Sequence, residues 1–266
     1  MQSLPGRKRG ASRILVTGAS SGIGAALARH YAGSGRRLML WGRDRTRLDS
    51  VAAECRALGA QVATRSIDLA DPQAARAALA LDDDAFAFDL AILAAGLGDI
   101  RPDGALTERP ELVIELGCVN FTTPAMMATL LAGHMAARGG GRIGLLGSVA
   151  AFHDLPYAPA YAGSKAGLTR FAAALRLGMR DHGVSVTLAS PGFVDTPMSR
   201  RLDCAKPFLL DVETAAARIA RAVDAGRAHL VLPWPFSVLR AAQALLPGPV
   251  ARAILTRTRV VQTPRG

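Results

Sequence analysis

Short apolar runs alternate along the chain with longer segments whose apolar residues recur at helical spacing. The apolar runs expected to be strands are residues 13–16, 38–41, 61–67, 90–93, 142–146, 184–189 and 229–232. Most lack clean alternation of apolar and polar positions, as do parallel strands buried on both faces. Helices are expected near residues 23–34, 46–58, 72–80, 109–137, 160–182 and 212–225. This order predicts an α/β fold with a doubly wound parallel sheet of about seven strands flanked by helices.

No linker divides the chain, so residues 12–232 are expected to form a single domain. Residues 1–11 are basic and are expected to be a disordered tail. Residues 233–266 are expected to be an apolar and basic extension of the same domain, with one short helix over residues 236–246. Segment 233–259 has two interpretations: a packed cover over one end of the sheet, or a surface that lies on a membrane or admits an apolar ligand.

The 266 residues are 50% hydrophobic, which is sufficient for a large core. The formal charge of +11 comes mostly from arginine, since the lysines are Lys8, Lys165 and Lys206 alone. No helix-turn-helix, zinc or aromatic-basic pattern is present, so we interpret the charge as compositional bias rather than as a nucleic-acid surface. Against that bias, the lysine at position 165 stands out, because ammonium and guanidinium groups differ in reach and hydrogen bonding.

The cysteines, Cys55, Cys118 and Cys204, show neither metal-ligand spacing nor a disulfide framework. No metal site is therefore expected, and unpaired cysteines suit a reducing cytosol. The basic N-terminus has no apolar signal core, and no run reaches the ~18 uninterrupted apolar residues of a membrane span. These features predict a cytoplasmic protein.

A glycine-rich turn follows the first expected strand and opens the first expected helix. Glycines permit a tight turn and let backbone N–H groups approach a pyrophosphate at the helix N-terminus. Because a strand precedes and a helix follows, we favour a Rossmann-like nucleotide site over an ordinary turn. The expected cofactor contacts in this turn are Gly18, Ser20, Ser21, Gly22, Ile23 and Gly24.

The end of the second strand indicates which dinucleotide fits. An NAD site usually places an acid here for the ribose 2′-hydroxyl, but Gly42 has no carboxylate and Arg43 can pair with a 2′-phosphate. Arg45 and Arg47 add positive charge. NADP(H) is therefore favoured, and the alternative is that Asp44 faces the ribose of NAD(H).

Tyr161 and Lys165 are four residues apart and share one face of an expected helix. The lysine ammonium favours the phenolate, so we expect it to lower the pKa of Tyr161 from about 10 towards the range of a working acid or base. Beside a nucleotide turn, the pair suggests proton transfer coupled to hydride transfer. Taken alone, Tyr161 could be a half-buried packing residue.

With these motifs, residues 12–232 resemble the short-chain dehydrogenase/reductase family, in its branch of about 250 residues. By this resemblance, Asp68 and Leu69 contact the adenine, and Ala95 and Gly96 keep the backbone close to the cofactor. The loop that closes on the nicotinamide would carry Pro191, Gly192, Val194 and Thr196. The catalytic residues implied by the resemblance are Asn120, Ser148, Tyr161 and Lys165.

One motif departs from the family pattern. The usual Asn-Asn-Ala-Gly after the fourth strand is Leu93-Ala94-Ala95-Gly96 in this chain. A lost buried hydrogen bond costs about 1 kcal/mol, which a matched apolar neighbour can offset. We interpret the departure as a change in sheet support that leaves the acid/base chemistry intact but bears on the placement of Asn120.

The resemblance implies an NADP(H)-dependent oxidoreductase that interconverts a carbonyl and an alcohol. Tyr161 would exchange a proton with the substrate oxygen, to which Ser148 would donate a hydrogen bond. Lys165 would stabilise the phenolate and, like Tyr161, contact the cofactor, while Asn120 would hold a water linked to Lys165. The alternatives are a non-catalytic dinucleotide-sensing protein and a membrane-associated reductase of a lipid-like substrate.

The substrate pocket is expected between segments 98–106, 150–160 and 198–210, which are largely apolar. The basic residues in these segments are Arg101, Arg200, Arg201 and Lys206. Together they suit an apolar ketone or acyl chain that bears an anionic group. His134 and His153 are interpreted as structural or surface residues.

Oligomers are also implied by the resemblance. In many relatives, the helices corresponding to residues 109–137 and 160–182 pair across a two-fold axis. A homodimer or homotetramer is therefore expected, acting on a small molecule and not on nucleic acid.

Overall fold

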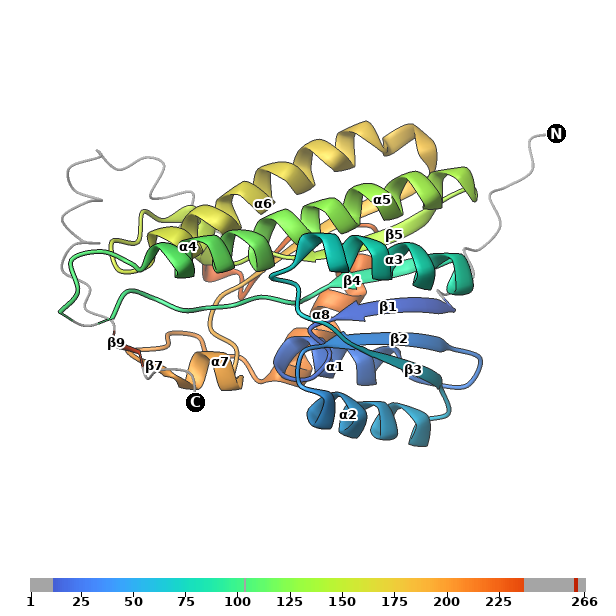
Figure 1. Ribbon diagram of the computed structural model, residues 1–266, viewed down its shortest axis with the longest axis horizontal. Helices are drawn as coiled ribbons and strands as arrows, with labels where there is room; N and C mark the ends of the chain where they lie inside the picture. Colours follow the sequence, from blue (N-terminus) through green and yellow to red (C-terminus); the bar gives the residue numbers. More distant parts are fainter. Residues whose placement is uncertain (1–11, 103, 237–260, 263–266) are drawn as a thin grey trace.

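A seven-stranded parallel sheet forms the centre of the computed structural model, which describes residues 12–102, 104–236 and 261–262. Its strands are β1 (Arg13–Thr17), β2 (Arg37–Gly42), β3 (Gln61–Ser66), β4 (Leu90–Leu93), β5 (Gly141–Leu146), β6 (Val184–Pro191) and β8 (His229–Leu232). They lie in the order β3-β2-β1-β4-β5-β6-β8, and every neighbouring pair is parallel. Figure 1 shows this order from β3 to β5. The predicted doubly wound sheet is confirmed.

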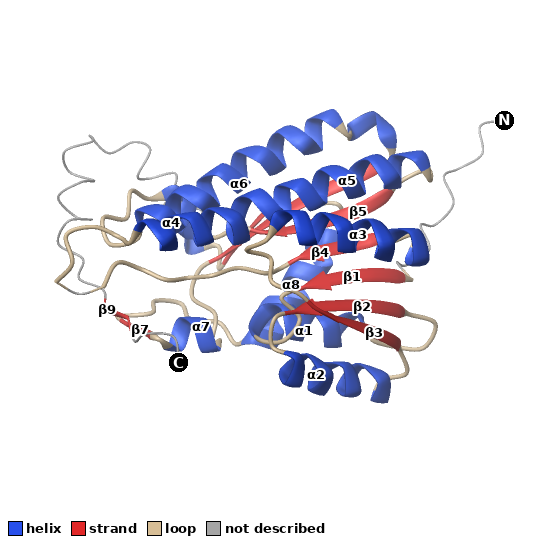
Figure 2. Ribbon diagram, viewed as in Figure 1, coloured by secondary structure: helices blue, strands red, loops and turns tan. Residues whose placement is uncertain are grey.

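Helices cover both faces of this sheet (Figure 2). One layer contains α1 (Gly22–Tyr31), α2 (Arg45–Ala57) and α8 (Val212–Asp224); the other contains α3 (Pro72–Phe86), α5 (Thr123–Ala137) and α6 (Pro159–Gly178). Side chains along β1 point alternately to the two faces of the sheet, which explains why there is a hydrophobic core on each face. Ile14 and Val16 are buried in the core under α1, and Leu15 is buried in the core on the opposite face. A strand covered by helices on both faces therefore reads as one continuous apolar run.

Helix α3 continues past its predicted end at residue 80 because the aspartates that follow are buried and paired. Asp82 accepts a hydrogen bond from Trp41 Nε1 at 2.9 Å. Asp83 accepts one from Arg138 Nη1 at 3.0 Å and lies 2.7 Å from Nδ1 of His134. A run of acids usually indicates a solvated surface, but here it ties α3 to the sheet and to α5. His134 therefore has a structural role, as expected from the sequence.

The single helix predicted over residues 109–137 is divided in the structure. It consists of α4 (Pro110–Gly117), the π-helical turn η1 (Cys118–Thr122) and α5. By length and composition, Pro110–Ala137 is the one helical stretch among the described residues that could cross a membrane, with a mean hydropathy of 1.2. Half of the most apolar part of this stretch is buried inside the protein, and α5 lines the core. The stretch therefore packs as part of the protein core.

Several short elements after β6 were not predicted. They are α7 (Pro197–Arg200), β7 (Leu202–Asp203) and β9 (Val261–Gln262), and β7 pairs with β9 in an antiparallel ribbon. The helix expected over residues 236–246 lies outside the described residues except for Phe236, and so does the tail 1–11. The membrane interpretation of segment 233–259 gains no support, because most of that segment also lies outside the described ranges.

Candidate active site

A cavity of about 750 Å³ opens at the carboxyl ends of the parallel strands. It runs from the turn between β1 and α1, past the ends of β2 and β4, to the segments that follow β5 and β6. The strand order reverses between β1 and β4, which is the switch point where open α/β sheets bind ligands. Every predicted cofactor contact lines this cavity, and so does Ser148, whereas Asn120 lies behind Gly96.

The turn after β1 has no room for side chains at two of its glycines. Gly18 has a φ of 68°, and a Cβ there would lie 2.8 Å from Cα of Ala95. A Cβ on Gly24 would lie 2.2 Å from the carbonyl oxygen of Gly18. Ser21, the N-cap of α1, makes no side-chain cap, so the first N–H groups of this helix are available at the cavity wall. This cradle fits a pyrophosphate.

Arg43 lines the cavity at the end of β2, whereas Arg45 and Arg47 do not. The alternative residue, Asp44, caps α2 by accepting a hydrogen bond from the Arg47 backbone at 2.9 Å and pairs with its guanidinium at 2.7 Å. Asp44 is thus occupied by helix α2 and does not line the cavity among the described residues. At the end of β2, the charged residue that lines the cavity is therefore Arg43 and not Asp44.

Sequence reasoning missed a carboxylate beside this arginine. Arg43 Nη1 lies 3.8 Å from Oε1 of Glu115 and 4.0 Å from Oδ2 of Asp68. Glu115 belongs to α4, and no spacing in the sequence connects it with β2. The charge of Arg43 is therefore shared between two acids of the same chain.

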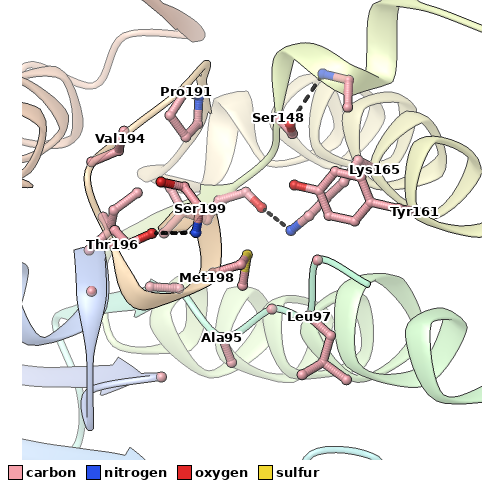
Figure 3. Close-up of a pocket in the computed structure, with 18 of the residues that line it drawn as sticks. Ala95, Leu97, Ser148, Tyr161, Lys165, Pro191, Val194, Thr196, Met198 and Ser199 are labelled. Atoms are coloured by element: carbon pink, nitrogen blue, oxygen red, sulfur yellow. Dashed lines mark hydrogen bonds between the residues drawn. The ribbon is translucent and has the colours of Figure 1, made fainter. Parts of the chain in front are cut away.

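Tyr161, Lys165 and Ser148 converge on the middle of the cavity (Figure 3). Lys165 is buried and its Nζ donates a hydrogen bond to the carbonyl oxygen of Leu146 at 2.8 Å. Burial lowers the pKa of Lys165 to about 8. Burial also raises the pKa of Tyr161, although a hydrogen bond with Ser148 acts against that rise. The expected lowering of the Tyr161 pKa by Lys165 is therefore wrong for this structure, because desolvation of the phenol dominates.

Asn120 sits in the π-turn η1 and is fully buried. Its side-chain oxygen accepts a hydrogen bond from Leu97 N at 2.8 Å, and its Nδ2 donates to Leu97 O at 2.9 Å and to Ser164 Oγ at 3.3 Å. Leu93, where the family has asparagine, is buried in the apolar core. The backbone of Leu97 thus holds Asn120 without the missing amides. π-Turns are frequent at functional sites.

Gly96 connects Asn120 with the lysine. A Cβ on Gly96 would lie 3.2 Å from Oδ1 of Asn120 and 3.4 Å from Nζ of Lys165. The three residues therefore meet at one point on the cavity wall, and a side chain at position 96 would press on both functional groups.

The segment after β6 forms another wall. Thr196 Oγ1 accepts a hydrogen bond from Ser199 N at 3.3 Å, which caps α7. A Cβ on Gly192 would lie 2.5 Å from the ring of Phe236, a lining residue from the start of the C-terminal extension that the motifs did not reveal. At this point the extension covers the cavity.

All three segments expected around the substrate contribute to the lining, as does His153. The basic residues expected to bind an anion do not line the cavity among the described residues; they are Arg101, Arg200, Arg201 and Lys206. Arg200 pairs with Asp195, and Arg201 pairs with Asp99. The expectation of an anionic group gains no support from the residues that line the cavity.

A dinucleotide cradle and a Tyr–Lys pair in one cavity at the switch point of a parallel sheet define a class of nucleotide-dependent oxidoreductases. The family model for short chain dehydrogenase matches residues 12–206. The chain belongs to the short-chain dehydrogenase/reductase family, as the motifs predicted.

Known proteins of this family resemble the chain along most of its length. An uncharacterised oxidoreductase of Myxococcus xanthus is 32% identical over 92% of this chain and 96% of its own. Human short-chain dehydrogenase/reductase 3 is 30% identical over 92% of this chain and 83% of its own. A short-chain dehydrogenase from Sphingobium yanoikuyae, solved in complex with NADPH, has a TM-score of 0.77 and 26% identity, covering 93% of this chain and 96% of that one.

Proposed function

We propose that this member of an oxidoreductase family interconverts a carbonyl and an alcohol with NADP(H), with Tyr161 as the general acid and base. The observation that carries the proposal is the convergence of Tyr161, Lys165 and Ser148 in the cavity that begins at the glycine turn. A phenol, an ammonium and a hydroxyl at one point can deliver a proton and stabilise a developing oxyanion.

The choice of NADP(H) over NAD(H) is supported by two contacts. Arg43 lines the cavity, whereas Asp44 is engaged as the cap of α2. The Sphingobium relative, which binds NADPH, adds support from similarity. A guanidinium pairs well with a phosphate dianion, and an acid at this position would repel it.

When bound, NADPH supplies the hydride to the carbonyl carbon. The side chains of the protein supply the proton and stabilise the charge that develops. Tyr161 gives its proton to the carbonyl oxygen, and the hydroxyl of Ser148 donates a hydrogen bond to that oxygen as negative charge develops. Lys165 stabilises the resulting phenolate, and Asn120 fixes the loop at Leu97 against helix α6. In alcohol oxidation the same groups act in reverse.

The experiment that tests the proposal replaces Tyr161 with phenylalanine and measures turnover and cofactor binding together. We expect Tyr161→Phe to lower kcat for ketone reduction by about 100- to 10,000-fold, the range of general acid catalysis. NADPH affinity, followed by the fluorescence of the bound nicotinamide, should change little because the ring remains. Tyr157→Phe is the matched control, since Tyr157 is a tyrosine that lines the same cavity but precedes helix α6. Full turnover by Tyr161→Phe would contradict the proposed role.

A further inference from the structure

The end of the cavity beyond Tyr161 is lined by apolar side chains from three segments. Ile100 follows β4, Leu155 precedes α6, and Met198 and Leu202 follow β6. Among the described residues that line the whole cavity, the charged side chains are Arg43, Asp68 and Lys165. The first two lie at the ribose end and the third belongs to the catalytic group. The substrate end therefore offers no fixed charge of its own within the described part of the chain.

The arginines near this end are already bound by acceptors of the same chain. Arg200 makes a two-point ion pair with Asp195, with N–O distances of 2.7 and 2.9 Å. Arg201 is hydrogen-bonded to Asp99, and both side chains are largely buried. Drawing Arg201 towards a second anion would leave the largely buried carboxylate of Asp99 unpaired. Arg200 is 67% exposed and does not line the cavity.

Two further groups near this end can carry positive charge. Lys206 stands between lining residues at positions 205 and 207 without lining the cavity, and its charge adds to that of Arg200 in lowering the pKa of Asp195. His153 lines the cavity, with its ring edge-on to Phe152 at 6.4 Å. Lys206 therefore places no cation inside the cavity.

The apolar walls are held in a fixed arrangement. The side chain of Gln262, in β9, accepts a hydrogen bond from Ile100 N at 2.9 Å and donates one to Gly98 O at 2.8 Å. Arg101 N donates to Tyr157 O at 2.9 Å. A Cβ on Gly98 would lie 2.6 Å from Sδ of Met198, so these two walls touch. The loop after β4 is therefore fixed against both neighbouring segments.

Resting on the proposed function, we propose that the substrate is an uncharged carbonyl compound with an apolar body, or its alcohol. The apolar body lies against the side chains of Ile100, Leu155 and Met198, and the carbonyl oxygen faces Tyr161 and Ser148. Reduction takes a hydride from NADPH and a proton from Tyr161, so the C=O double bond becomes a CH–OH group and NADP⁺ remains. Substrate and product are both neutral, which suits a chamber in which an unpaired carboxylate is costly to bury.

The test compares two ketones of equal length, methyl hexyl ketone and the keto acid in which its distal methyl is a carboxylate. The measurements are kcat/KM for NADPH oxidation and the affinity of each ketone for the enzyme–NADPH complex. We expect the neutral ketone to be preferred by at least about tenfold in both measurements, since an unpaired carboxylate loses its hydration on entry.

Substitution of Met198 should weaken this preference only when the new side chain carries a positive charge. Met198→Lys places a cation at the apolar wall, so we expect the preference for the neutral ketone to fall by about tenfold or more. Met198→Gln has similar length without charge and should keep the preference of the wild type. If both variants changed the preference equally, the apolar chamber would not be what selects the substrate.

Equal or better binding of the keto acid by the wild type would overturn the inference, and so would failure of both ketones to bind. Loss of keto-acid binding in Lys206→Met would then identify the cation responsible. If the neutral ketone bound preferentially but was not reduced, the substrate class would stand and the proposed reductase function would fail. The binding measurement thus separates the two proposals.

Discussion

At the scale of single residues, the proposed preference for NADP(H) rests on Arg43 and on the two acids that share its charge. Glu115 and Asp68 lie 3.8 and 4.0 Å from its Nη1. We expect Arg43→Ala to weaken NADPH binding by about 10- to 100-fold, the value of one or two charge-assisted hydrogen bonds, and to leave NADH binding nearly unchanged.

Glu115→Gln should act in the opposite direction. It should tighten NADPH about two- to fivefold, because an exposed ion pair that competes with the phosphate is removed.

The measurement is the Kd of each variant for NADPH and NADH by nicotinamide fluorescence. Arg45→Ala is the control, since Arg45 pairs with Asp49 at 3.8 Å and does not line the cavity. If Arg43→Ala reduced the affinity for both cofactors equally, Arg43 would act on the shared pyrophosphate and not on the ribose phosphate.

Lys165 should make the protein more stable as the pH rises above about 8. Its pKa is lowered to about 8 in the folded protein by burial, whereas an unfolded lysine titrates near 10.4. Between these values the unfolded chain keeps a proton that the folded protein has lost, so the free energy of unfolding increases with pH across this window. The total contribution is at most about 3 kcal/mol.

The experiment measures urea unfolding of the wild type and Lys165→Met from a pH of about 7 to about 10. The stability of the wild type relative to the variant should rise across this range. Cys55, whose pKa is raised to about 11 by burial, works in the opposite direction but is present in both proteins and cancels in the difference. A difference that stayed constant with pH would mean that Lys165 keeps its ordinary pKa in the folded protein.

At the scale of elements, helix α6, which carries Tyr161 and Lys165, is capped from another segment. Its N-cap residue, Ala158, has no side chain that can accept a hydrogen bond. Glu108, which is buried, accepts one from Ala160 N at 2.9 Å instead. The carboxylate lies at the positive end of the helix that carries Tyr161 and Lys165, and it thereby helps to position both.

We expect Glu108→Ala to lower the free energy of unfolding by about 1–2 kcal/mol, the value of a helix cap. Glu108→Gln keeps an acceptor for Ala160 and removes a charge whose burial raises the pKa of this carboxyl, so it should cost less. Denaturant unfolding monitored by circular dichroism measures both variants. Equal losses in the two variants would show that the charge, and not the hydrogen bond, is what stabilises α6.

The elements show what local patterns can and cannot predict. The strands and most helices followed from apolar runs, because burial on two faces leaves a strong signature. The end of α3 did not follow, since Asp82 and Asp83 are satisfied by Trp41, His134 and Arg138 from distant segments. The short elements α7, β7 and β9 carry too few residues for any periodicity.

The residues of the candidate site were likewise predicted only in part. Residues that belong to contiguous motifs, such as the glycine turn and Tyr161 with Lys165, were found because spacing alone places them together. Glu108, Glu115 and Gln262 were missed, because each acts through a contact between segments that are remote in the sequence. The direction of the Tyr161 pKa shift was also wrong, since burial of a phenol cannot be judged from helix spacing.

At the scale of the whole molecule, several large apolar side chains remain exposed on the helices outside the sheet. Val113 and Ile114 of α4 are 46% and 67% exposed, and Leu177 of α6 is 74% exposed. These two helices belong to the stretches that the family resemblance expects to pair across a two-fold axis. We therefore expect the chain to form a homodimer or homotetramer that buries these side chains.

Light scattering of the wild type at micromolar concentration should give the mass of a dimer or tetramer. Ile114→Lys should shift the mass towards the monomer, because a charge buried in an apolar interface is unpaired. Leu58→Lys is the matched control, since Leu58 is 54% exposed at the end of α2, on the other face of the sheet, and should leave the mass unchanged. A monomeric wild type, or an equal effect of both substitutions, would rule out pairing through α4.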